Sequence, residues 1–274
     1  MVNGNRRVLP GFSLSLGYTV FCLSVLVLLP IVACFAKAAS LSFDQFRAAV
    51  WTERTRAAYL LTFGASLSAA VANVILGLLI AWVLVRYQFP AKRLMDSLID
   101  LPLALPTAVG GLVYASLYVK KGWLGRFLVP FGIQAAYSRL AIVLVLTFIG
   151  LPFVVRTVQP VLEDLDPETE EAAASLGATR WQTFRAVILP SLYPALITGF
   201  ALAFARCLGE YGSVVFVSGN MPYKTEIAPV LIVARLEEFA YGEATAIAVV
   251  LLVTSFSMLV LINLLERWSK VEEA

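Results

Sequence analysis

Long apolar runs separated by short polar segments are the feature that most constrains how this chain can fold. The first run covers residues 14–35, and about 20 apolar residues in a helix span the hydrocarbon core of a bilayer. Of the 274 residues, 60% are hydrophobic and 14% are charged, whereas soluble domains have roughly 45–50% apolar and about 25% charged residues. The chain is therefore predicted to be an all-α integral membrane protein, because only internally bonded backbone is stable in lipid.

Six transmembrane helices are predicted, at residues 14–35, 59–85, 94–118, 140–158, 192–217 and 244–265. Arg6 and Arg7 precede the first run and Ala36-Lys37-Ala38 follows it, which is also the arrangement of a cleaved signal peptide. The apolar core of a signal peptide has only ~7–15 residues, so an uncleaved first helix is favoured. Six spans place both chain ends on the same side of the membrane.

The composition argues against several kinds of chemistry. Histidine is absent, which removes the commonest general base and metal ligand. Cys22, Cys34 and Cys207 lie within apolar runs and are interpreted as small buried side chains. No GxxxxGK[ST] phosphate loop occurs, and the net charge is only +3. We expect no catalytic residue, no metal site, no bound cofactor and no nucleic-acid partner.

The second span carries small side chains at every fourth position, namely Ala65, Ala69, Asn73 and Gly77. Residues four apart share one helix face, and a face of small residues lets two membrane helices approach closely. Helix packing is the favoured interpretation. The alternative is a stripe that faces a pore, with Asn73 as its polar group.

The third span is interrupted. Asp100 lies near its start, and Pro102 and Pro106 follow. Prolines remove backbone hydrogen bonds and kink a helix, and lipid tolerates this only where protein or a water-filled cavity covers the freed carbonyls. The pattern fits a helix beside a transport path and equally fits a kinked, packed helix.

The fifth span contains two charged residues, Arg206 and Glu210, one helical turn apart and able to pair. Charges at bilayer depth cost at least ~2.5 kcal/mol and usually face the bundle interior or water. A functional role and a structural ion pair are both open at this point.

Residues 166–190 form the longest polar interruption of the apolar pattern. Asp166 is placed to cap a helix that begins at Pro167, and Gly177 is placed to end it in a left-handed conformation. Thr179 and Gln182 have the spacing of a capping box for a second helix. The sequence predicts a helix–turn–helix element on which another protein docks.

Charge does not settle the orientation. With the side of residues 166–190 counted as inside, ten Lys and Arg residues fall on that side and ten on the other. The rule that basic residues concentrate on the cytoplasmic side therefore gives a tie.

The same segment resembles the EAA loop of the membrane subunits of ABC importers. In that loop EAA is followed by three residues, Gly, nine residues, Ile, one residue and Leu-Pro, and Val187 stands here where the family has Ile. The matching residues are Glu171, Ala172, Ala173, Gly177, Leu189 and Pro190. The resemblance implies that these residues couple the chain to a cytoplasmic ATPase, and therefore that both termini are cytoplasmic.

Four further segments, at residues 86–90, 100–109, 152–162 and 208–212, look like the sulfate/molybdate branch of that family. The likeness is closest to the T-type permease subunits of bacterial sulfate/thiosulfate importers. It implies an ABC type-1 importer fold over residues 59–264, with the coupling loop at 161–190. Residues 1–58 would add a cytoplasmic tail, the first helix and an external loop, and 265–274 a second tail.

The resemblance further implies a bacterial inner-membrane importer with partners. These are a W-type permease subunit, two ATPase subunits that bind ATP and Mg²⁺, and a periplasmic sulfate/thiosulfate-binding protein. Asn73, Asp100, Pro102, Pro106, Arg206 and Glu210 are the candidates for the pore or its gate. The nearest alternative is a molybdate or tungstate permease. An ion-coupled secondary transporter would leave residues 166–190 unexplained, and a membrane enzyme lacks the clustered nucleophile and base it needs.

Overall fold

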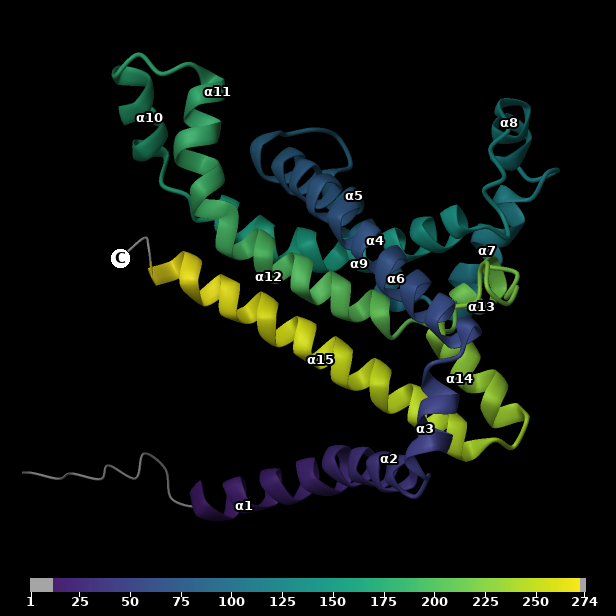
Figure 1. Cartoon of the computed structure of the whole chain (residues 1–274). Coiled ribbons are helices and arrows are strands. Elements are labelled where there is room, and N and C mark those ends of the chain that lie inside the picture. The colour runs from purple at the N-terminus through teal and green to yellow at the C-terminus, as the bar shows by residue number, and fades with distance from the viewer. Residues whose placement is uncertain (1–11, 272–274) are drawn as a thin grey trace, which may run out of the picture.

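The structure, a computed structural model, describes residues 12–271. Within these residues every regular element is helical (Figure 1), as the sequence predicts. Five helices are long and apolar enough to cross a bilayer. The all-α membrane fold is thus confirmed, and the predicted spans need two corrections.

The centre of the molecule is formed by α4 (Glu53–Arg86), α9 (Arg139–Glu163) and α12 (Leu189–Leu208), which pack along one another. Small residues permit the close approach. A Cβ on Gly77 would lie 2.7 Å from Val154 Cγ1, and one on Gly150 would lie 2.3 Å from Asn73 Nδ2. Ala65, Ala69, Asn73 and Gly77 are all buried, so the small-residue face of the second span packs against other helices of this chain.

The predicted third span is not one helix. It is divided into α5 (Lys92–Ile99), α6 (Leu101–Ala104) and α7 (Thr107–Tyr118). Leu105 is extended, with φ −82° and ψ 136°, because a residue before proline avoids the helical region. Pro106 therefore ends α6 and sets the start of α7.

The predicted fifth span is also shorter than expected. Its helix ends at Leu208, and the short α13 (Val214–Val217) follows an irregular segment. This segment packs against α7, where a Cβ on Gly111 would lie 2.3 Å from the carbonyl oxygen of Ser213. Continuous helix to residue 217, as the apolar run predicts, is therefore wrong.

Segments predicted as loops contain short helices. These are α3 (Phe43–Val50), α8 (Gly125–Leu128) with the 3₁₀ turn Val129–Phe131, and α14 (Ala228–Glu237). The long α4 begins at Glu53, six residues before the predicted span, because the Thr52 side chain caps it.

The first apolar run forms α1 (Phe12–Leu23), a π-helical turn (Ser24–Leu28) and α2 (Leu29–Ala39). Only α2 packs closely on the rest of the chain, against α15 (Tyr241–Val271). Figure 1 shows α10 (Pro167–Ser175) and α11 (Arg180–Thr183) at one end of the molecule, and α3, α8 and α14 at the other. We name these the α10 end and the α8 end. The described ends of α1 and α15 both lie toward the α10 end.

Candidate coupling site and transport path

The helix α10 is built from local signals. A side-chain oxygen of Asp166 accepts a hydrogen bond from the Glu168 amide at 3.0 Å, and Pro167 occupies the first helical position. Glu168 and Glu170 place negative charge in the first turn, where the helix dipole favours it. The sequence prediction for this helix is confirmed, down to its cap.

Gly177 ends α10 with φ +82°. Its amide donates to the Ala174 carbonyl at 2.9 Å, and the next amide, that of Ala178, donates to the Ala173 carbonyl at 3.0 Å. This pair of bonds is a Schellman motif, which requires a left-handed residue and therefore favours glycine. The helix α11 then starts at the predicted capping box of Thr179 and Gln182.

The outer surface of this element is exposed and carries two large apolar side chains among charged ones. None of the residues of α10 is buried, Glu171 and Ala172 are exposed, and Ala173 is half-buried. At the turn, the side chain of Leu176 is 88% exposed, and Trp181 is 67% exposed. Leu176 and Trp181, both exposed on this short element, make it a candidate docking surface.

The α10 helix is tied to the membrane core by a contact that the sequence did not predict. Arg86, at the end of α4, forms an ion pair with Glu170. The same guanidinium lies over the Trp82 ring, 5.1 Å from its centroid. Trp82 in turn meets Phe184 edge to face, with the ring centroids 5.5 Å apart, so α4 contacts both α10 and the π-helical turn that follows α11.

Beyond α11 the chain continues without a break into the membrane. A π-helical turn (Phe184–Ile188) joins α11 to α12, and the combined helix runs over Arg180–Leu208. Leu189 and Pro190 are half-buried at this junction. A displacement of α11 is therefore carried into α12 through continuous helix, and a displacement of α10 reaches α4 through the Arg86 contacts.

Asn73 lies in the centre of the chain and faces no surface. Its side chain is fully buried, and within residues 12–271 neither its amide nitrogen nor its carbonyl oxygen has a hydrogen-bond partner. Its neighbour across the packed helices is Gly150. This placement favours packing over the pore-facing interpretation.

Asp100 belongs to a charged cluster around Arg156 of α9. The guanidinium of Arg156 binds Asp100 at 2.7 Å and Asp96 at 2.7 Å, and it also donates to Gln159 at 2.8 Å. The cluster joins α5, the first part of the interrupted third span, to α9 of the core. Further along, Pro102 is buried and Pro106 is exposed.

Arg206 and Glu210 form the predicted ion pair, at 2.6 Å. Glu210 lies past the end of α12, and its carboxylate also accepts from the amide and hydroxyl of Ser213, at 2.9 and 3.0 Å. The Glu210 side chain is 3% exposed, whereas that of Arg206 is 32% exposed. The carboxylate thus holds the irregular segment, and the guanidinium reaches the surface of the chain.

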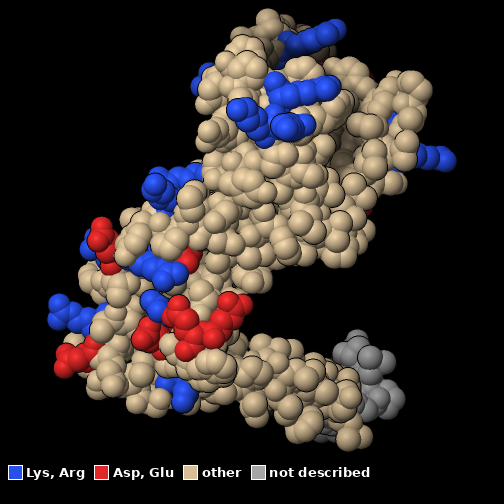
Figure 2. Space-filling model, turned by 90° about the vertical axis from the view of Figure 1, so that its right-hand side faces the viewer, with Lys and Arg blue, Asp and Glu red and all other residues tan. Residues whose placement is uncertain are grey.

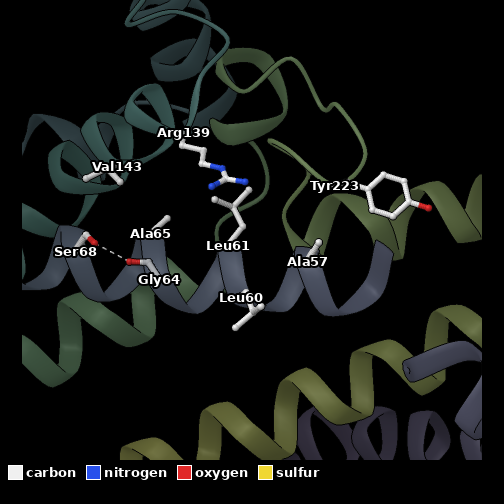
Figure 3. A pocket seen from close by; sticks show the side chains of 9 residues that line it. All are labelled: Ala57, Leu60, Leu61, Gly64, Ala65, Ser68, Arg139, Val143 and Tyr223. Atoms are coloured by element: carbon white, nitrogen blue, oxygen red, sulfur yellow. Dashed lines mark hydrogen bonds between the residues drawn. The ribbon is translucent and has the colours of Figure 1, made fainter. Parts of the chain in front are cut away.

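A groove of about 460 Å³ opens along α4 toward the α8 end (Figure 3). Leu61, Gly64 and Ser68 of α4 lie along it. Arg139, at the start of α9, extends over α4 with its guanidinium near Leu61. An exposed cation thus stands at one side of an otherwise mostly apolar groove.

A second contact that the sequence did not predict lies at the α8 end. Arg54 forms a two-fold hydrogen bond with Glu226, at 2.8 and 2.7 Å, and the Glu226 side chain is 4% exposed. The two residues are 172 positions apart. The pair joins the start of α4 to the segment that precedes α14.

The fold and these sites define a class of protein. Apolar helices with breaks at Pro106 and after Leu208, together with an exposed helix–turn–helix element at one end, are features of a membrane-spanning transport subunit. Residues 73–271 match the family described as the binding-protein-dependent transport system inner membrane component. The chain belongs to this family.

Relatives agree with the predicted branch of the family. A sulfate transport system permease protein of Salmonella typhimurium is 50% identical over 262 residues, covering 96% of this chain and 95% of that protein. Its counterpart in Synechocystis is 51% identical over 252 residues, covering 92% and 88%. The resemblance to sulfate permease subunits is confirmed.

Solved structures agree with the fold. A bacterial ABC transporter that imports the acidic polysaccharide alginate matches with a TM-score of 0.77 at 16% identity, over 93% of this chain and 94% of that chain. The same kind of transporter in complex with an alginate-loaded periplasmic protein gives 0.75 at 18% identity, over 93% of each chain. At these identities the match shows the type-1 importer fold.

Proposed function

We propose that this chain is one of two membrane-spanning subunits of an ATP-driven importer that moves sulfate and thiosulfate into the cytoplasm. The observation that carries the proposal is the α10–Gly177–α11 element, which presents exposed apolar side chains and is bonded to the core helices. The names of the relatives support sulfate as the substrate.

In this function α10 is the coupling helix. Glu171, Ala172 and Ala173 lie on the helix that seats in a groove of the ATPase, and Leu176 and Gly177 form its tip. The α10 end is cytoplasmic, and both termini are on that side. The partners are a W-type permease subunit, two ATPase subunits that hold ATP and Mg²⁺, and a periplasmic sulfate/thiosulfate-binding protein.

The chain itself forms part of the wall of the transport path, changes conformation during the cycle and catalyses no reaction. When the ATPases close, α10 is displaced, and Arg86 and the continuous helix from α11 to α12 pass the displacement to the core. The breaks at Pro106 and after Leu208 allow the neighbouring segments to move separately. Among the pore candidates, Arg206 has a partly exposed guanidinium, paired with Glu210, that a sulfate dianion can contact weakly, as transit requires.

The test replaces Gly177 by tryptophan. Gly177→Trp places a bulky side chain in a left-handed backbone that only glycine adopts without strain, so ATPase co-purification and sulfate uptake should both be lost while membrane insertion stays normal. Gly132 is a matched control, because it too has positive φ (+75°) and open space around it. Gly132→Trp should retain the ATPase.

Normal uptake by the Gly177→Trp complex would refute the coupling assignment. The substrate is tested separately, by growth on sulfate of a sulfate-uptake mutant that carries this chain and its partners. Rescue of molybdate-dependent growth alone would favour the molybdate alternative. Transport without any ATPase would favour an ion-coupled transporter.

A further inference from the structure

The α8 end of the molecule is divided into two halves of different charge. Residues 119–139 and 211–225 contain four and one basic residues respectively and no Asp or Glu. The five are Lys120, Lys121, Arg126, Arg139 and Lys224, and all are exposed. Figure 2 views this end, and Lys and Arg gather on its upper part whereas the acidic side chains gather mainly on the lower part.

The exposed parts of these two segments, residues 119–139 and 219–224, form one surface, which we name the basic lobe. Arg139 Nε donates to the Lys224 carbonyl at 2.9 Å, and the Tyr137 amide donates to the Val217 carbonyl at 3.0 Å. A hollow of about 500 Å³ between them is lined by Lys120, Tyr137 and Met221 among others.

The lobe also exposes aromatic side chains. Trp123 is 66% exposed, Phe127 57% and Phe131 81%. The guanidinium of Arg126 lies over the Phe127 ring, 4.8 Å from its centroid. Exposed aromatic residues combined with arginine are the side chains most enriched where proteins contact one another.

The position of the charge needs an explanation. Under the proposed function, on which this inference rests, the α8 end is periplasmic. Basic residues are normally depleted from short loops on that side. The other half of this end balances its charges, with Arg235 paired to Glu238 and Glu243 and Arg54 paired to Glu226. Within the described residues, no salt bridge involves a cation of the basic lobe.

We propose that the basic lobe docks an acidic face of the soluble oxyanion-binding protein. A protein face can neutralise several exposed cations together and cover the aromatic side chains. A single free anion would gain little from cations that stay in bulk water. Complementary charge chiefly speeds the encounter of the two partners.

The test reverses three charges, Lys120→Glu, Lys121→Glu and Arg126→Glu, in the full importer reconstituted in nanodiscs. ATPase activity is measured against the concentration of sulfate-loaded binding protein. The half-saturating concentration should rise about tenfold or more, and the maximal rate should be unchanged. Higher salt should weaken stimulation of the unaltered importer and have less effect on the variant. The control, Arg47→Glu with Arg56→Glu, changes exposed charges in the other half and should leave half-saturation unchanged.

Three outcomes would overturn the proposal. One is an unchanged half-saturating concentration. Another is a defect that appears or disappears with anionic lipid in the nanodisc, which would identify a lipid contact. The third is loss of the second permease subunit on purification, which would identify a subunit interface. If the binding protein fails to stimulate even the unaltered importer, the proposed function itself fails, which is a distinguishable result.

Discussion

The ion pair between Arg86 and Glu170 is expected to hold the coupling helix against the membrane core, and reversing each charge tests this. Arg86→Glu places a carboxylate beside Glu170, and Glu170→Arg places a guanidinium beside Arg86. Each single change replaces attraction by repulsion. The double change restores a pair of opposite charges in the same place.

The structure sets the size of the effect. The side chains are 29% and 27% exposed, so the pair is screened and contributes up to about 1 kcal/mol. The contact of the Arg86 guanidinium with Trp82 contributes about 0.5–1 kcal/mol more. A loss of about 1–2 kcal/mol lowers the ratio of molecules with α10 held against α4 to molecules with α10 detached from α4 by a factor of roughly 5–30. The double reversal recovers only the ion pair, because a carboxylate does not bind the tryptophan face.

The assay is sulfate uptake per ATP hydrolysed in proteoliposomes that contain the whole importer. Arg86→Glu should lower this ratio, and adding Glu170→Arg should raise it part of the way back. Arg93→Glu and Glu168→Arg are controls, because both residues are exposed and neither is in a salt bridge within residues 12–271. If Arg86→Glu lowers the ratio no more than Arg93→Glu does, or if the double reversal recovers nothing, the reasoning is refuted.

Three further predictions concern docking and stability. Leu176→Asp should weaken ATPase binding roughly 10–100-fold in a co-sedimentation titration, because burying a leucine contributes about 1.5–3 kcal/mol; unchanged affinity would mean that the ATPase does not cover this side chain. Arg54→Ala should lower the thermal midpoint in detergent, since the Glu226 carboxylate would remain buried without its partner, at a cost of roughly 3 kcal/mol; an unaltered midpoint would contradict the burial argument. Gly77→Leu should destabilise the chain by at least about 1–3 kcal/mol through overpacking, whereas Gly64→Leu, with no atom within 4 Å of its added Cβ, should be tolerated.

The sequence alone determined the elements whose signals are local. The helix–turn–helix structure of residues 166–183 was predicted correctly, because the Asp166 cap, the left-handed Gly177 and the Thr179 capping box depend on neighbours within a few positions. The apolar runs determined the membrane fold, since about 20 consecutive apolar residues are enough to predict a transmembrane helix. The small-residue face of α4 was predicted to pack, and it does.

Tertiary structure decided everything that joins distant parts of the chain. Arg156 meets Asp96 and Asp100 across 60 and 56 positions, Arg86 meets Glu170 across 84, and Arg54 meets Glu226 across 172. Charge and hydropathy show that such residues need partners, and the fold alone selects which partner comes within 3 Å. The same holds for the segment after Leu208, because an apolar run looks alike whether it continues a helix or breaks to pack against α7. The sequence therefore specified the helix–turn–helix element at residues 166–190, and the tertiary structure decided which core helices this element contacts.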